Sequence, residues 1–530
     1  MLRFVVFLLF LLAPGLACAG TSDVGAYLAD PSSSMPGASA ADRQALAALY
    51  AARGGQKAWD MSTPDTVKRA QGFFDSIKAV ITYHGLDADD YPVDAMRKLA
   101  ATPDADKMQL EILISDSLLR LTHDLRGESV DLAAIYPGWE FHRAPADDIA
   151  DLAAAIKAGK LGAFFDRIAP QDPAYAALAA ALKSYRGFAA NGGWPTVGNG
   201  PILHPGDDDP RIAQLRARLK AEGYTLPDGD QPDTYDDKLR DAVVDYQRRN
   251  GLKPDGVLGQ QTVAALDVPV AARIGQIRAN MERWRHMPQD WPPANYVEVN
   301  IPDFSVKIVK DGQEIFRGAV VDGRTDRPTP FIDSKITNAV INPSWHVPIS
   351  IARKDILPKL KRDAHYLEKQ GIVIAGRDQD PSGLTIDWRD LKPDDFNYRL
   401  RQNPGDINSL GQIKFNFANA FSVYMHGTPH QELFDKAERD FSSGCVRLED
   451  PLRVAEILLA ANKGDWSEQK IQDEIDAGKT RFVPLRQPIP VYFTYWTVFA
   501  DSSGRINFRK DIYGYDQLLM NGFKNGHAGN

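Results

Sequence analysis

The sequence predicts a multidomain α+β protein: a helical scaffold, a small three-helix domain, and a mostly-β domain with an inserted helical cap. Its 530 residues exceed what one ordinary hydrophobic core contains, so we expect several domains. Apolar residues recur at helical spacing over 41–195 and again over 205–268. From about residue 295 they alternate with polar residues, which is typical of strands.

The composition and the net charge indicate which classes of binding partner to expect. Hydrophobic residues make up 44% of the chain and charged residues 25%, a balance typical of soluble globular proteins. The formal net charge is -8 and is not concentrated in long runs. A nucleic-acid-binding protein usually presents a basic face, and this sequence shows none. We therefore expect no nucleic-acid partner.

The first residues, MLRFVVFLLFLLAPGLACAG, have the pattern of a cleavable signal peptide. The apolar run at 4–12 is too short to span a bilayer comfortably, and Ala17-Cys18-Ala19 matches the small-residue cleavage pattern. We expect residues 1–19 to be removed on export to the periplasm. A membrane anchor, a buried N-terminal helix and lipid attachment at Cys18 are the alternatives. Residues 20–40 are rich in Gly, Ser and Pro and predict a flexible leader.

Residues 41–195 predict helices without a cluster of catalytic residue types, which indicates a scaffold. A segment dense in Gly, Pro and Asp at 191–210 marks a boundary. Over 205–268 three short helices with a turn at Asp255-Gly256 resemble a peptidoglycan-binding domain, which implies contact with cell-wall glycan or stem peptide. A generic three-helix bundle is the alternative. The expected buried positions are Ile212, Leu215, Leu219, Leu239, Val243, Tyr246, Val263 and Leu266.

The mostly-β domain is expected over 295–485. Asp311-Gly312 predicts a hairpin turn, and a charged, helical segment at about 349–410 interrupts the strands as a cap beside a site. Asp450 can cap a helix whose first residue is Pro451. Residues 486–530 predict a C-terminal β-hairpin, with Gly504 at its turn, followed by a tail.

Cys445 is the one cysteine that remains if Cys18 leaves with the signal peptide. Gly444 precedes it in SSGC, so the backbone can turn sharply and expose Sγ. The N–H groups of Gly444 and Cys445 are candidates for an oxyanion hole. Because a free thiol is mostly protonated at neutral pH, a reactive cysteine needs a neighbour that favours the thiolate. An inert buried thiol is the alternative.

A histidine that could activate this thiol lies 19 residues earlier, at the end of FSVYMH. Strand alternation puts His426 and Tyr424 on one face. The opposite, core-facing set is Phe421, Val423 and Met425. An imidazole within hydrogen-bond reach of the sulfur would accept its proton, so the sequence predicts a Cys445–His426 pair with an ionised thiol.

The motif around these two residues resembles that of the L,D-transpeptidases, the cysteine enzymes that cross-link peptidoglycan. His426-Gly427 matches the histidine–glycine part, and Ser442-Ser443-Gly444-Cys445-Val446-Arg447 matches the cysteine part. Ser443 stands where many members have a second histidine. NPSWHVP at 342–348 and the segment 401–419 look like other parts of the same catalytic domain.

The resemblance implies a reaction and its participants. Cys445 would form a thioester with a donor tetrapeptide stem and release D-Ala, and an acceptor stem would then give a 3→3 cross-link. Hydrolysis instead would give L,D-carboxypeptidase activity. Carbapenem-type β-lactams would acylate the same cysteine. Cell-wall synthesis proteins are possible partners, and no cofactor is needed. Five further residues are candidates for substrate binding or support. Ser443 would shape the turn or orient His426, and Arg447 would bind a substrate carboxylate or form a structural ion pair. Tyr424 and Trp345 would line the pocket or pack in the core, and Gly427 would support the site.

Other functions remain open from the sequence. His426, His430 and Cys445 could be imagined as zinc ligands, but Gly427 and Pro429 prevent a helix from presenting both histidines. We expect no metal. The same domain could attach a lipoprotein to the wall, and a non-enzymatic wall-binding scaffold is a further alternative.

Overall fold

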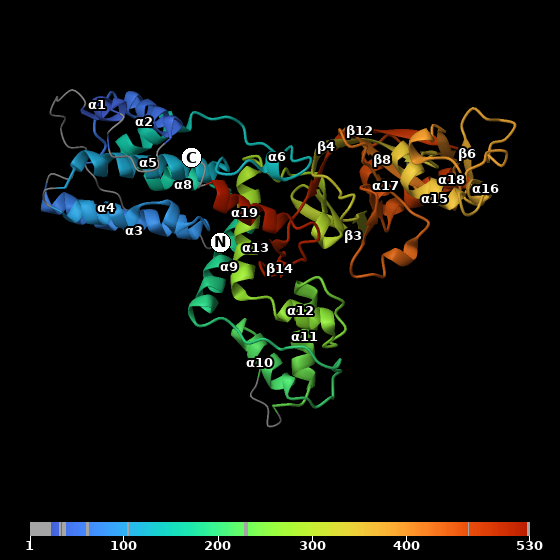
Figure 1. The fold of residues 1–530 in the computed structure, drawn as a ribbon, viewed down its shortest axis with the longest axis horizontal. Coiled ribbons are helices and arrows are strands. Elements are labelled where there is room, and N and C mark those ends of the chain that lie inside the picture. The colour runs from blue at the N-terminus through green and yellow to red at the C-terminus, as the bar shows by residue number, and fades with distance from the viewer. Residues whose placement is uncertain are drawn as a thin grey trace.

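The computed structural model describes residues 23–526 apart from 31–32, 34–38, 60–62, 103–104, 227–231 and 465. A group of helices and the large sheet lie at opposite ends of the long axis, and the three-helix unit projects to one side (Figure 1). The multidomain α+β prediction is confirmed. The expected signal peptide and Cys18 lie outside the described residues. Within them, no helix combines the length and apolarity that a membrane span needs.

The helical end has its own hydrophobic core. The expectation of a flexible leader is wrong for residues 23–29. These form a helix because Val24 and Leu28, four residues apart, share a face that packs into this core. The helices are α1 (Asp23–Ala29), α2 (Ala40–Ala52), α3 (Pro64–Tyr83), α4 (Val93–Ala101), α5 (Lys107–Arg126), α7 (Asp148–Ala158) and α8 (Leu161–Ile168).

Two further parts of the expected scaffold pack elsewhere. Helix α9 (Pro173–Ala190) and the segment around α6 (Leu132–Ile135) bury their apolar side chains in the core of the sheet domain. Helix α13 (Val270–His286) contacts α9 and completes this central region (Figure 1). The scaffold is therefore held to the sheet by shared core residues.

The three-helix unit consists of α10 (Arg211–Ala221), α11 (Asp237–Arg249) and α12 (Gln260–Leu266). All eight positions expected on its apolar faces are buried in one cluster. Gly256, at the expected turn, has φ +69°, a conformation that favours glycine. The three-helix prediction is confirmed.

The sheet domain closes on itself. Its nine strands follow the order β10-β3-β11-β9-β8-β4-β12-β1-β2, and β3 also pairs with β2. Asp311 and Gly312, both with positive φ, form the expected two-residue turn between β2 and β3. The strands are β1 (Tyr296–Asn300), β2 (Ser305–Lys310), β3 (Gln313–Gly323), β4 (Ile332–Ile341), β8 (Ile413–Phe417), β9 (Met425–His426), β10 (Asp440–Ser442), β11 (Val446–Leu448) and β12 (Arg481–Thr494).

Helices α17 (Pro451–Leu459) and α18 (Glu468–Asp476) follow the sheet's shortest strands. Asp450 caps α17 as expected, because its carboxylate accepts the Arg453 N–H at 3.0 Å. The C-terminal boundary differs from the expectation. Residues 486–494 belong to β12, which pairs with both β1 and β4, so they are part of the central sheet. The hairpin β13 (Val498–Ala500) and β14 (Ile506–Phe508) does turn at Gly504.

The cap has a small core of its own, formed by residues between 352 and 400. It is mixed rather than helical, because β5, β7 and β6 form a three-stranded sheet within it. Its elements are β5 (Trp345–His346), α14 (Ile349–Ile351), the π-helix η3 (Ala352–Ile356), α15 (Leu357–Leu360), α16 (Tyr366–Lys369), β6 (Ile372–Ile374), the 3-10 helix η4 (Pro393–Asp395) and β7 (Leu400–Gln402).

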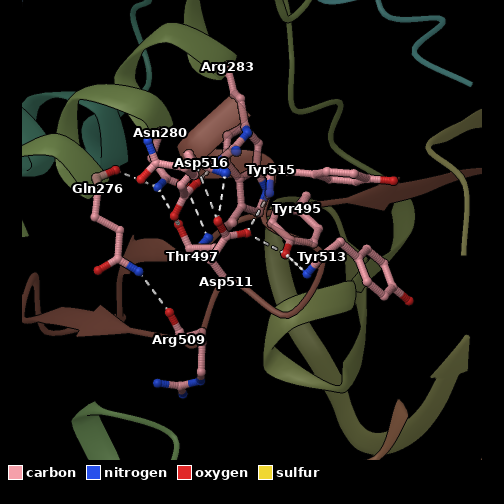
Figure 2. Close-up of polar contacts among 12 residues, drawn as sticks. Gln276, Asn280, Arg283, Tyr495, Thr497, Arg509, Asp511, Tyr513, Tyr515 and Asp516 are labelled. Carbon is pink, nitrogen blue, oxygen red and sulfur yellow. Dashed lines mark hydrogen bonds and ion pairs between the residues drawn. The ribbon is translucent and has the colours of Figure 1, made fainter. Parts of the chain in front are cut away.

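A buried polar network joins α13, the β13 region and the C-terminal helix α19 (Tyr515–Gly526), as Figure 2 shows. The Arg283 guanidinium donates to Asp516 at 2.6 Å and to Tyr136 at 2.9 Å. The other Asp516 oxygen accepts the Thr497 hydroxyl at 2.6 Å. Asn280 in turn donates to Thr497 at 2.7 Å. Both members of the ion pair are buried, so each depends on the other for its charge.

Replacing Asp516 with Ala should therefore destabilise the protein by about 3–5 kcal/mol, because Arg283 would keep a buried charge without its partner. Urea unfolding followed by tryptophan fluorescence measures this, since Trp284 and Trp496 stack in the same core. The exposed pair Lys510–Glu438 provides the control, and Glu438→Ala should cost at most about 1 kcal/mol. Equal effects of the two substitutions would contradict the prediction.

Candidate active site

Cys445 lies in the turn between β10 and β11 and is partly exposed. Gly444 has φ +109°, which a residue with a side chain rarely adopts. The Ser442 hydroxyl braces the turn, because it accepts the Gly444 N–H at 3.0 Å and donates to the Cys445 carbonyl at 2.6 Å. Ser442 therefore helps to shape the turn, and the turn role suggested for Ser443 stays a prediction.

His426 is held at the centre of the sheet. Strand β9 pairs with β11 in parallel, so that His426 lies opposite Arg447, and with β8, so that it lies opposite Lys414. The backbone at Gly411 packs directly against the backbone of Gly427 and Thr428, since a Cβ added to Gly411 would come within 2.6 Å of the Thr428 nitrogen. This close contact fixes the end of β9.

The ring of His426 has a defined tautomer. Its Nδ1 lies 2.5 Å from the carbonyl oxygen of Gly427. A carbonyl only accepts hydrogen bonds, so Nδ1 carries the proton and the lone pair lies on Nε2. Burial and the neighbouring Arg447 charge lower the pKa of His426 to about 3. The imidazole is therefore neutral at physiological pH and can accept a proton.

The expected alternation of FSVYMH holds only for its second half. Val423 and Met425 are buried as predicted, but Phe421 is 42% exposed. Ser422 has φ +57°, which breaks the extended backbone between Phe421 and the rest. The strand pattern therefore begins at Val423.

Three side chains lie around the sulfur of Cys445: Tyr424 and Trp345, which the sequence suggested as pocket lining, and Lys414, which it did not. The hydroxyl and backbone N–H of Tyr424 hydrogen-bond to Sγ, and the Trp345 side chain hydrogen-bonds to Tyr424. The ammonium of Lys414 lies 3.7 Å from the centre of the Tyr424 ring. Tyr424 and Trp345 thus line the site, and Trp345 links it to the first strand of the cap.

The protonation of Cys445 differs from the expectation of an ionised resting thiol. Burial raises the pKa of Cys445 above its ordinary value, although Tyr424, Lys414 and Arg447 oppose this shift. In the described part of the chain, no hydrogen bond joins the thiol to the His426 ring. Both groups are therefore neutral at rest, because each is largely removed from water.

Two cations flank this neutral pair. Burial lowers the pKa of both Lys414 and Arg447, and both lie close enough to Cys445 for their charges to act on it. Among the described residues neither side chain forms an ion pair, and the buried Arg447 Nε has no hydrogen-bond partner. The structural ion pair considered for Arg447 is absent there. The Glu432 carboxylate acts on Arg447 without forming an ion pair with it. The site therefore has two cations that are not directly paired with an anion among the described residues.

His430 does not join the site. Its Nδ1 lies 3.2 Å from Glu432 on the surface. No group of three or more His, Cys, Asp and Glu side chains that could hold a metal ion occurs in the described ranges. The arrangement thus offers thiol and imidazole chemistry.

Sequence reasoning missed Lys414, Ser442 and Arg327. Lys414 could have been found, because it is the charged residue on the polar face of the alternating strand-like segment IKFNF. The Arg327 guanidinium donates to the Ser443 hydroxyl at 3.0 Å. It lies 116 residues away in sequence, and no local pattern connects the two.

Comparisons with known families agree with this architecture. Residues 294–472 match the model of the L,D-transpeptidase catalytic domain. Residues 208–266 match the "Putative peptidoglycan binding domain", and residues 44–182 match the scaffold domain. Three regions of the chain are thus similar, in chain order, to a scaffold domain, a peptidoglycan-binding domain and an L,D-transpeptidase catalytic domain.

Individual relatives cover only parts of the chain. A Haemophilus influenzae protein described as "Putative L,D-transpeptidase" is 36% identical over 247 residues, which are 46% of this chain and 48% of that protein. A Bacillus licheniformis protein, "Probable N-acetylmuramoyl-L-alanine amidase", is 33% identical over 88 residues, or 17% of this chain and 25% of that protein. The match thus spans about half of the first relative and a quarter of the second.

Two solved L,D-transpeptidase structures are similar at low scores. The Xylanimonas cellulosilytica structure has 15% identity and a TM-score of 0.18, covering 56% of this chain and 98% of that one. The Stackebrandtia nassauensis structure has 12% identity and a TM-score of 0.21, covering 56% and 96%. At these scores neither structure bears on the argument.

The substitution Lys414→Gln should raise the pKa of Cys445 further, because the ammonium favours the thiolate. The rate of Cys445 alkylation by iodoacetamide, located by mass spectrometry, measures the thiolate fraction at each pH. In the unmodified protein this rate should still be rising above the ordinary thiol pKa of ~8.5, and in the variant the rise should move to higher pH. The exposed Lys335 provides a control, and Lys335→Gln should leave the profile in place. A shift to lower pH in Lys414→Gln would contradict the assignment.

Proposed function

We propose that this protein is a peptidoglycan L,D-transpeptidase that forms 3→3 cross-links between stem peptides through a thioester on Cys445. The observation that carries this proposal is a partly exposed thiol near a neutral imidazole and two cations that form no ion pair with any described residue. It lies within the segment that matches the L,D-transpeptidase catalytic domain. A thiol nucleophile, a base and cations that attract carboxylates are what acyl transfer from an anionic peptide needs.

In the first step, the sulfur attacks the carbonyl carbon next to the terminal D-Ala of a donor tetrapeptide. The thiol proton passes to Nε2 of His426 as the carbon–sulfur bond forms. The carbon–nitrogen bond to D-Ala then breaks, and the imidazolium returns the proton to the leaving amine. Since both groups are neutral at rest, proton transfer accompanies the attack and no stable thiolate is required.

In the second step, the side-chain amine of an acceptor stem attacks the thioester. A carbon–nitrogen bond forms, the carbon–sulfur bond breaks, and the amine proton returns to the sulfur through His426. Attack by water would instead release a tripeptide, which is L,D-carboxypeptidase activity. Attachment of a lipoprotein would need an amine from that protein, and we rank both below cross-linking.

The cations of the site suit the substrate's charge. Peptidoglycan stems carry carboxylates at diaminopimelate and at terminal D-Ala, and an arginine can hold a carboxylate with two hydrogen bonds. We assign Arg447 to one of these carboxylates, because its buried Nε has no hydrogen-bond partner among the described residues. Lys414 contributes charge beside the sulfur.

The developing oxyanion needs backbone donors. The Gly444 N–H already donates to Ser442 at 3.0 Å, so it would have to be shared. The Cys445 N–H is therefore the stronger candidate of the two. One such donor typically contributes about 3 kcal/mol to transition-state stabilisation.

The other domains support a location at the cell wall. We propose that the signal peptide directs the chain to the periplasm, where the peptidoglycan-binding domain holds it on its substrate. Cell-wall synthesis proteins are possible partners of the scaffold. A non-enzymatic wall-binding role would leave the thiol and the imidazole on neighbouring strands without a purpose.

Cys445→Ser and His426→Ala should each abolish cross-linking, because one removes the nucleophile and the other the base. Incubation with disaccharide-tetrapeptide followed by mass analysis separates cross-linked dimer, hydrolysed tripeptide and exchanged tetrapeptide. His430→Ala, on a surface histidine outside the site, is the matched control. Normal turnover by either site variant would refute the assignment.

A carbapenem should acylate Cys445 once per chain, since its strained amide resembles the acyl donor and ring opening leaves a covalent thioester. Mass spectrometry of the intact protein and its peptides measures the adduct and its position. An adduct on another residue, or none, would count against a nucleophilic Cys445.

A further inference from the structure

Arg327 connects the cap to the catalytic turn. Its guanidinium donates to both carboxylate oxygens of Asp355, at 2.5 and 3.0 Å. The same Nη1 donates to the Ser443 hydroxyl at 3.0 Å. Asp355 lies in the π-helix of the cap, and Ser443 is two residues before Cys445. One side chain thus touches two elements that are otherwise far apart in sequence.

The backbone that carries Arg327 is fixed. Its loop folds tightly onto the end of β3, since a Cβ on Gly323 would lie only 2.3 Å from the Arg327 carbonyl oxygen. The Thr329 hydroxyl accepts the Gly323 N–H at 2.8 Å, and Tyr513 donates to the Gly323 carbonyl at 2.6 Å. The guanidinium of Arg327 is therefore attached to a backbone that these contacts hold in place.

This loop also holds the catalytic turn directly. The Arg324 N–H donates to the Ser442 carbonyl at 3.0 Å, immediately before the residue that Arg327 contacts. Ser442 and Ser443 are thereby fixed at two successive points. The conformation of the turn determines where the Cys445 N–H and Sγ lie.

The cap, by contrast, has little else to fix it to this side of the sheet. Its helices and strands pack mainly against one another around a separate core. The Arg353 side chain binds the carbonyls of Phe396 and Asp394, which closes the π-helix onto the cap itself. Two polar contacts in the described part of the chain, Arg327–Asp355 and Trp345–Tyr424, connect the cap to the surroundings of the cysteine. Such π-helical turns are frequent at functional sites.

We propose that Arg327 is a positioning residue that aligns the Ser443–Cys445 turn for acylation only while it is paired with Asp355 of the cap. This inference rests on the proposed function of Cys445. The Asp355 carboxylate orients the guanidinium, and the guanidinium holds Ser443. When the cap is in place against the sheet, this chain of contacts also aligns the Cys445 nucleophile. Misplacement of a reacting group by about 1 Å can slow a reaction about 10²-fold, so a small shift of this turn is sufficient.

The test compares two reactions of the same sulfur in the full-length protein. Carbapenem acylation needs an aligned turn, whereas alkylation by iodoacetamide needs only an accessible thiol. Arg327→Gln and Asp355→Asn should each slow acylation about 10–100-fold while alkylation and the melting curve stay unchanged. Arg327→Lys should be intermediate, because lysine cannot bind the carboxylate with two parallel hydrogen bonds.

The double variant and a matched pair make the test specific. Arg327→Gln combined with Asp355→Asn should be no slower than the slower single variant, because the two residues act as one unit. Lys369 and Asp363 form another ion pair within the cap, so Lys369→Gln should leave acylation unchanged. Three outcomes would overturn this inference but not the proposed function. The losses of acylation rate could add in the double variant, alkylation could slow as much as acylation, or the single variants could be acylated at the wild-type rate. A wild-type protein that forms no acyl-enzyme would overturn the proposed function and this inference together.

Discussion

The site depends on the parallel pairing of two very short strands, β9 and β11. Their register sets His426 beside Arg447 and places Cys445, two residues before Arg447, next to Tyr424. A one-residue slip would turn every side chain to the other face, which would move Tyr424 and His426 away from the site and bring Met425 into it. The neighbouring strands β8 and β3 prevent this, because each pairs with one of the two. The long sheet thus serves to hold two residues of β9 in place.

Burial and charge act in opposite directions at the cysteine. Removal from water favours the neutral thiol and the neutral imidazole, while Lys414 and Arg447 favour the thiolate. A carboxylate bound between these cations would weaken their effect on the sulfur. The same cations hold the pKa of His426 low, which keeps its Nε2 free of a proton. The imidazole is therefore neutral beside a neutral thiol and can accept a proton.

Local sequence signals predicted a large part of this structure. The Asp311-Gly312 turn, the Asp450 cap and the apolar faces of the three-helix unit follow from rules that act over a few residues. These local signals gave wrong predictions where contacts between residues far apart in sequence determine the structure. Two prolines within 486–494 made a central strand look unlike one in the sequence. Phe421 does not follow the strand alternation, because Ser422 adopts a positive φ. The thiol pKa and the Arg327 contact depend on tertiary surroundings that no short motif contains.

The two ends of the cap lie side by side. Trp345 pairs with Gln402 and His346 with Arg401, so the chain leaves and re-enters the sheet domain at adjacent strands. Neighbouring strands are about 4.8 Å apart, a gap that a short turn can bridge. Together with its separate core, this makes the cap a modular insertion. Caps of different size could occupy the same position during evolution without altering the strands that carry the cysteine and the histidine.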